Sequence, residues 1–444
     1  MAAGPIKLEM LGDQETKAGN YFVSNYPPYS FWKPDNVGEV LSAIERKPLP
    51  NTPLGIYTHI PFCRKRCHFC YFRVYTDKNA NEIMGYVNGV IEELKMYASK
   101  PFIDGRTPKF VYFGGGTPSY LSSQALIHLT DSMKSHLSWD NVEEVTFECE
   151  PGTLTEHKIS VIRDIGVTRL SLGVEHFQEH ILKLNGRAHG AKEIDRAYGF
   201  ARACGFPQIN IDLIAGMMGD TDQDWDFAIE KTLELAPDSV TIYQMEIPYN
   251  TTIFAEMQAG GSDIAPVATW VKKREWVQRA FSKLEEHGYT VTSAYTAVKN
   301  AKDTRFLYRD HLWQGADLLG LGVSSFSHVG GTHFQNQHNI DPFVERVESG
   351  NLPVYRALTP SSDEKLIREA VLQFKLGSLD LNYFREKFGV DLRTRFPEAI
   401  GYIRATGHLT ENEDRLTLDI EGLLQVDRYV HEFFLPEHRD ARYA

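Results

Sequence analysis

Short apolar runs alternate with amphipathic helical stretches over the first half of the chain. Six runs end in polar residues or glycine, and they lie at 54–62, 109–118, 143–151, 168–177, 208–216 and 239–248. Apolar residues between them recur at helical spacing, as in 81–98 and 222–236,. Repeated strand–helix units predict a parallel sheet rolled into a barrel. The expected fold class is α/β, a partial (β/α)6 barrel, whose chemistry would lie at the carboxyl ends of its strands.

The pattern changes after residue 267. A long amphipathic helix is predicted at 269–288, strand-like residues follow at 290–297, and a mixed apolar run covers 318–334,. From about residue 359, short helical stretches and a strand with a turn indicate a small helical domain of winged-helix type,. Four regions are therefore predicted: an N-terminal extension (1–50), the barrel (51–290), a barrel-closing and substrate-side segment (291–358) and a C-terminal domain (359–444).

Composition limits the function and the location. The 444 residues are 42% hydrophobic and 24% charged, and the net charge is -12, with no long basic run that would suit a nucleic acid,. No apolar run approaches membrane-spanning length, and the N-terminus lacks a signal-like apolar core,. Five cysteines with three in one loop do not form a disulfide framework, so a reducing cytoplasm is expected,. Cys149 and Cys204 are expected to be small buried residues.

The most informative feature is the run HIPFCRKRCHFCYF, which holds Cys63, Cys67 and Cys70. Three thiolates can hold three irons of a [4Fe–4S] cube and leave the fourth iron open to a small molecule with amino and carboxylate groups. The spacing C-x3-C-x2-C, with an aromatic residue before the last cysteine, is typical of radical S-adenosylmethionine (SAM) enzymes. The alternatives are chance thiols or zinc, which would want a fourth ligand at finger spacing. His59 and His68 are close but fit that spacing poorly.

Further candidate ligand groups stand at the ends of the predicted strands. The glycine run at 114–118, with Gly115, Gly116 and Thr117, lets the backbone approach a ligand closely,. Glu148 and Asp212 are carboxylates that can accept from two ribose hydroxyls, and their alternative role is a helix cap or surface acid.

Arg187 can pair with a methionine carboxylate, although an exposed helix arginine is the alternative,. Tyr57 and His59 alternate on the first strand and so share a face, where they can stack on adenine, face the substrate or belong to the core,. Glu175 and Glu246 also end strands and are candidates for acid–base or hydrogen-bonding roles,.

The histidine-rich run 328–339 leaves three interpretations open. It is a metal site, a polar rim for the substrate, or a hairpin loop around its glycine pair.

From about residue 54 the chain resembles the radical SAM family that includes oxygen-independent coproporphyrinogen III oxidase. The blocks that carry the resemblance are YTHIPFC, FGGGTPSYL, FECEP, SLGVEHF, INIDLIAG and DLLGLGVSSFS. The resemblance implies a [4Fe–4S] cluster and two SAM molecules. It implies a first SAM near Tyr57, Gly115, Glu148 and Phe326, and a second near Gly116, Thr117, Glu175, Arg187, Asp212 and Glu246.

The sequence departs from the oxidase at three positions. Phe72 stands where the oxidase has an extra cysteine, Glu175 where it has glutamine, and Glu246 where it has alanine. The run CYFRVYTDKN resembles the methylases and cyclopropanases of natural-product pathways instead. This likeness favours transfer of one carbon from a second SAM to an unsaturated carbon, started by a 5′-deoxyadenosyl radical, with Glu175, Glu246, Tyr57 and His59 as catalytic candidates.

Two alternatives remain beside one-carbon transfer. One is dehydrogenation of coproporphyrinogen III or a related haem step, and the other is a haem-binding chaperone without turnover. The expected partners are a small-molecule substrate, an electron donor such as flavodoxin or ferredoxin, and a methyltransferase. Neither a nucleic acid nor a membrane is expected.

Overall fold

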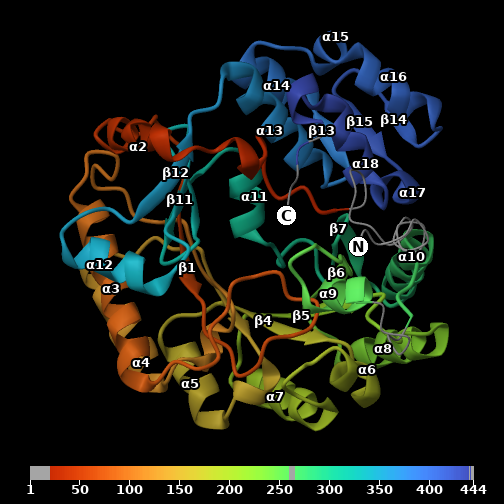
Figure 1. Cartoon of the computed structure of the whole chain (residues 1–444). Helices are drawn as coiled ribbons and strands as arrows, with labels where there is room; N and C mark the ends of the chain where they lie inside the picture. The colour runs from red at the N-terminus through yellow and green to blue at the C-terminus, as the bar shows by residue number, and fades with distance from the viewer. Residues whose placement is uncertain (1–20, 260–265, 440, 442–444) are drawn as a thin grey trace.

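The computed structural model describes residues 21–259, 266–439 and 441 (Figure 1). Its main sheet has twelve strands, and the six in the middle of it are parallel. They are β1 (Leu54–Ile60), β2 (Phe110–Gly115), β3 (Glu144–Cys149), β4 (Arg169–Glu175), β5 (Gln208–Ala215) and β6 (Ser239–Gln244). Every one of these strands falls within an apolar run of the sequence, because a parallel strand is buried on both faces.

Helices connect the parallel strands and cover the outside of the curved sheet, as Figure 1 shows. They are α3 (Ala80–Ala98), α4 (Ser123–His136), α5 (Glu156–Asp164), α6 (Glu179–Leu184), α7 (Ala191–Ala203) and α8 (Asp222–Leu235). The helix α10 (Trp270–Glu286) packs beside α8. The α/β fold class with a mainly parallel sheet is thus confirmed.

Strands from 290–358 extend the sheet at both edges. Beyond β6 lie β8 (Thr296–Val298) and then β7 (Thr290–Ser293). β8 pairs antiparallel with β6, and β7 pairs antiparallel with β8. Beyond β1 lie the parallel β9 (Asp317–Leu321) and then the antiparallel β10 (Phe326–Val329), β11 (Thr332–Asn336) and β12 (Val354–Leu358). The sheet order runs from β12 to β7 without closing, so the barrel is partial.

The histidine-rich run forms the β10–β11 hairpin. His328 pairs with His333 across it, and Gly330 and Gly331 make the turn with positive φ angles. Trp32 stacks on His333 with 5.2 Å between ring centroids. Within the described residues, no group of three His, Cys, Asp or Glu is spaced to hold a single metal ion. The structure therefore supports the hairpin interpretation of this run.

The C-terminal region has its own three-stranded sheet and hydrophobic cluster. Its elements are α13 (Ser362–Phe374), β13 (Ser378–Asp380), α14 (Leu381–Phe388), α15 (Leu392–Arg395), α16 (Pro397–Ala405), β14 (Leu409–Glu411), β15 (Arg415–Leu418), α17 (Ile420–Leu423) and α18 (Val426–Val430). A capping box between Ser361 and Glu364 begins α13,.

The N-terminal segment 21–36 lies between the C-terminal region and the main sheet. Tyr21, Val23 and Tyr26 belong to the hydrophobic cluster of the C-terminal region. Lys33 pairs with Ala357 of β12, and the helix α2 (Val37–Ile44) follows. Residues 1–20 of the predicted extension lie outside the described residues. No helix in the described part of the chain is long and apolar enough to cross a membrane.

Candidate functional site

The loop with Cys63, Cys67 and Cys70 follows β1 at the carboxyl edge of the parallel strands. Backbone hydrogen bonds fix it on both sides: the Cys63 N–H donates to the Tyr75 carbonyl, and the His68 N–H donates to the Asn185 carbonyl. The loop is therefore held at the mouth of the barrel by its own later residues and by the segment that follows β4 and α6.

An ion pair adds to this anchoring. Arg64 donates through Nε and Nη2 to both oxygens of Glu150, at 3.0 and 2.9 Å. Burial opposes ionisation of Glu150, but hydrogen bonds from His189 and Arg64 outweigh it and lower its pKa to about 2. The carboxylate that follows β3 therefore stays charged and ties the cysteine loop to that strand.

The thiols have polar neighbours that suit thiolates. Thr117 Oγ1 donates to Cys63 Sγ at 3.3 Å, and Arg187 Nη1 donates to Cys67 Sγ at 3.3 Å. Burial raises the pKa of Cys63 to about 12 and that of Cys70 to about 11. Deprotonation of these thiols therefore needs a cation such as iron, whose binding releases their protons.

The glycine run makes room for the cysteine loop. A Cβ atom on Gly116 would lie 2.9 Å from Cys63 Sγ and 3.0 Å from the Phe62 carbonyl oxygen. Gly115 has a φ of +119°, and its N–H donates to Glu148 Oε2 at 3.1 Å. These two positions need glycine because of close approach and backbone conformation, respectively.

Two partly buried carboxylates stand on strands of the barrel, Glu148 on β3 and Asp212 on β5. Glu148 accepts from Tyr112 Oη at 2.6 Å, and burial raises its pKa to about 7. Asp212 accepts from Ser171 Oγ at 2.8 Å and from Asn210 Nδ2 at 2.9 Å, and burial also raises its pKa. Both acids are held by neutral donors, so a cation that entered the barrel would favour their charged forms.

Glu175 is the third acid at this edge, and its backbone is strained. Its φ of +66° is in the left-handed region, where β4 shifts register against β5,. Arg187 Nη1 lies 3.6 Å from Glu175 Oε1, while Arg187 Nη2 donates to the Gly173 carbonyl at 2.6 Å. Burial raises the pKa of Glu175 to about 7, although Arg187 opposes this shift. Arg187 thus links Glu175 to the cysteine loop.

Tyr57 and His59 share a face of β1, as the alternation predicts. Tyr57 Oη lies 3.0 Å from His59 Nδ1, and the Tyr57 ring stacks on Tyr112. Burial lowers the pKa of His59 to about 4, so its imidazole is neutral at pH 7. The pair forms one wall of the barrel interior beside Glu148.

Glu246 and Phe326 contact residues outside the cysteine loop. Glu246 Oε1 accepts from the Phe22 N–H at 2.6 Å, and the charges that act on it come from Asp427, Lys273 and Lys375. Phe326 stacks on Tyr29 at 4.2 Å and meets Trp32. In the described residues neither contacts the three cysteines, so the structure groups Glu175, but not Glu246, with the cysteine loop.

Several site residues were not expected from the sequence. One is Tyr112, which donates a hydrogen bond to Glu148. Another is the buried Arg169, whose guanidinium lies 4.1 Å from the Phe306 ring centroid. The charge of Arg169 lowers the pKa of Asp212, against the effect of burial. Arg169 lies six residues before Glu175 at the end of β4, so strand alternation was a usable signal for it, whereas Tyr112 lies three residues before Gly115 at the end of β2,. The N-terminal contact of Glu246 left no such local signal.

The residues present fit the expected cofactors. The donor set is three cysteines with Thr117 and Arg187 at their sulfurs, and no fourth ligand is spaced for a single ion among the residues described. That arrangement suits a cube that binds each thiolate to a separate iron better than it suits zinc. Three partly buried acids near one edge complement SAM, whose sulfonium and ammonium groups are cationic,.

Comparison with known proteins shows what the chain is similar to. Residues 57–231 match the model of the radical SAM superfamily. The chain is 26% identical to the heme chaperone HemW of Bacillus subtilis over 83% of this chain and 96% of that protein. It is also 26% identical to the oxygen-independent coproporphyrinogen III oxidase of Escherichia coli over 81% of each. The solved structure of the E. coli oxidase matches with a TM-score of 0.80 at 23% identity, over 93% of this chain and 96% of that one.

These findings correct the expected reaction. One-carbon transfer in a natural-product pathway rested on ten residues, 70–79, and on two acids, whereas the named relatives match four-fifths of the chain and are coproporphyrinogen oxidases and heme chaperones. Both acids also have partners within this chain, since Glu175 pairs with Arg187 and Glu246 holds the Phe22 N–H. The prediction of a methylase or cyclopropanase is therefore wrong.

The cysteine loop, the carboxylate-lined barrel and these comparisons agree: residues 57–231 match the radical SAM superfamily, and the chain is similar to oxygen-independent coproporphyrinogen III oxidases and heme chaperones.

Proposed function

We propose that this chain is a radical SAM enzyme that oxidatively decarboxylates a propionate side chain of a porphyrinogen. The observation that carries the proposal is the cysteine loop at the same edge of the barrel as the partly buried Glu148, Glu175 and Asp212, in a chain whose relatives include coproporphyrinogen III oxidases. When bound, a reduced [4Fe–4S] cluster and SAM supply a radical that abstracts hydrogen. The propionate would lose a hydrogen atom, carbon dioxide and one electron, and the electron needs an external acceptor.

The residues of this chain would bind and orient the reactants. Cys63, Cys67 and Cys70 would hold the cluster, and Arg187 would pair with a carboxylate beside it. Glu148 and Asp212 would accept hydrogen bonds from SAM. We include a second SAM in the proposal, since the three acids near this edge outnumber the two arginines, Arg187 and Arg169, that act on them.

The reducing electron would come from a protein such as flavodoxin or ferredoxin. Lys65, Arg66 and Arg73 stand beside the cysteines at the surface, and the adjacent Tyr71 and Phe72 are 44% and 46% exposed. This cationic, aromatic patch on an otherwise acidic chain suits an acidic electron carrier.

An anaerobic assay tests the proposed function. Protein reconstituted with iron and sulfide is mixed with SAM, a reductant, coproporphyrinogen III and an electron acceptor. The expected result is loss of carbon dioxide from the substrate with formation of 5′-deoxyadenosine. Equilibrium dialysis counts the SAM molecules bound per chain. Tight haem binding without any substrate turnover would favour the chaperone alternative, which the relationship to HemW supports.

SAM affinity is expected to rise with pH because of Glu148. Its carboxyl group has a pKa of about 7 through burial, and a cation binds only its ionised form well,. A single group with this pKa predicts a dissociation constant about tenfold lower at pH 8 than at pH 6. Titration of SAM into the cluster-bearing protein measures it.

Glu148→Gln should weaken SAM binding and flatten the pH profile, leaving the contribution of Glu175. The exposed Glu143→Gln variant is the control. A profile in Glu148→Gln as steep as that of the unmodified protein would exclude this role.

A further inference from the structure

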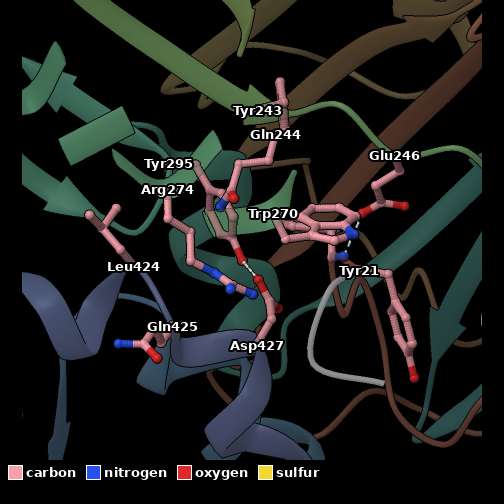
Figure 2. Close-up of a pocket in the computed structure, with 11 residues that line it drawn as sticks. Tyr21, Tyr243, Gln244, Glu246, Trp270, Arg274, Tyr295, Leu424, Gln425 and Asp427 are labelled. Atoms are coloured by element: carbon pink, nitrogen blue, oxygen red, sulfur yellow. Dashed lines mark hydrogen bonds between the residues drawn. The ribbon is translucent and has the colours of Figure 1, made fainter. Parts of the chain in front are cut away.

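A small cavity lies where β6, the N-terminal segment, α10 and the C-terminal region meet (Figure 2). Its volume is about 40 Å³, enough for roughly three water molecules,. Aromatic rings of Tyr243, Trp270 and Tyr295 form part of its wall, and Arg274 and Gln425 add polar groups. The space suits a group of about three heavy atoms with one flat polar face.

Two hydrogen-bond donors line the cavity from the same helix. Trp270 and Arg274 are four residues apart on α10 and therefore share a face,. The buried Trp270 Nε1–H has no hydrogen-bond partner among the described residues. A buried donor of this kind calls for an acceptor in the cavity.

The acids of the cavity are already engaged. Glu246 accepts from the Phe22 N–H at 2.6 Å. Asp427 accepts from the Tyr295 hydroxyl and from the Val23 N–H, and Figure 2 shows the Arg274 guanidinium beside it. These acids hold the N-terminal segment and Tyr295 in place.

Two lysines interact with the acids that line the cavity. Lys375 Nζ lies 3.8 Å from Asp427, and buried Lys273 also acts on Glu246. The Lys273 ammonium also donates to the Met245 carbonyl, and the Lys375 ammonium to the Val23 carbonyl. Burial lowers the pKa of Lys273 to about 7 and that of Lys375 to about 8, so an added anion would favour their charged forms,.

The cavity adjoins the barrel interior through Tyr243. This side chain lines the cavity, and Asp212 and Glu148 are among the groups that add to the rise in its pKa caused by burial. It is also 42% exposed, although it stands at the end of a central strand. A ligand held in the cavity could thus extend past Tyr243 toward the cysteine loop.

We propose that this cavity binds a carboxylate group of the substrate, with Arg274 and the Trp270 N–H as its donors. The identity of the substrate rests on the proposed function, in which a porphyrinogen carries several carboxylates. One side chain would be anchored here while another is presented to the reaction centre.

The test uses the cluster-bearing protein and two probes. Propionate binding is measured by saturation-transfer NMR, and KM and kcat are measured with coproporphyrinogen III. Arg274→Gln is expected to weaken propionate binding and to raise KM at least tenfold, with kcat changed less than twofold. Trp270→Phe keeps the ring and should raise KM about threefold. Lys283→Gln, on the exposed side of α10, is the matched control and should change neither.

The outcomes separate the two proposals. Partial recovery in Arg274→Lys, with unchanged cluster content and melting temperature, would support the carboxylate site. Equal propionate binding by the unmodified protein and Arg274→Gln, or none by the unmodified protein, would overturn it. Propionate binding that depends on Arg274, without any porphyrinogen binding or turnover, would keep the site and overturn the proposed function.

Discussion

Alanine at Cys63, Cys67 or Cys70 is expected to abolish the iron–sulfur cluster, whereas alanine at Cys149 or Cys204 should leave it intact. A site-differentiated cube has only three protein thiolates, so each substitution leaves two, which cannot hold it. Anaerobic reconstitution should give about four iron and four sulfide per chain in the unmodified protein. Iron and sulfide analysis with the visible absorption spectrum measures the loss.

The two control cysteines lie away from the loop. Cys149 is buried at the end of β3, with its Sγ 3.9 Å from the Phe147 carbonyl oxygen. Cys204 Sγ lies 3.7 Å from Ser160 Oγ at the end of α7. Complete cluster absorption in any one of the three loop variants would remove that cysteine from the ligand set.

The central strands could be predicted because the residues of each strand themselves show that it is buried. Each of β1 to β6 lies inside a continuous apolar run, and parallel order follows from the intervening helices,. The strand order at the edges of the sheet was harder to predict, because β9 pairs with β1 across more than 250 residues of sequence. No local pattern states which edge a later strand joins.

In the site, too, contacts between adjacent strands could be predicted from the sequence, whereas contacts with distant segments could not. The cysteine loop and the glycine run follow adjacent strands, so strand order alone brings Cys63 and Thr117 together. Glu175 ends β4 and Glu246 lies just past the end of β6, but Glu246 meets Phe22, 224 residues away in the chain. Such contacts depend on how the N-terminal segment and the C-terminal region pack, which the alternation of residues does not encode.

Removing the Arg187 guanidinium is expected to destabilise the protein in a pH-dependent way. Arg187 and Glu175 have side chains only 10% and 15% exposed, and their closest atoms are 3.6 Å apart. Breaking a buried pair by removing one partner typically costs about 3–5 kcal/mol, because the remaining charge is left uncompensated. Arg187→Met should therefore unfold more readily than the unmodified protein.

The pH dependence follows from Glu175. Burial already raises its pKa to about 7 with Arg187 present, and loss of the arginine removes an effect that lowers it. A folded-state pKa above the unfolded value means that folding favours the protonated acid, so stability falls as pH rises toward the folded pKa. Arg187→Met should thus be destabilised more at pH 8 than at pH 6.

The double variant Glu175→Gln/Arg187→Met isolates the pair. Neutral glutamine needs no counter-charge, so the double variant should recover most of the stability at pH 8 and lose the excess pH dependence. Melting temperatures of the iron-free protein at both pH values measure this without interference from cluster loss. Arg279→Met, which breaks surface pairs with Asp222 and Asp226, is the control and should change stability little at either pH,. If the double variant melted no higher than Arg187→Met at pH 8, the main partner of Arg187 would be the Cys67 sulfur, which lies 3.3 Å from its Nη1.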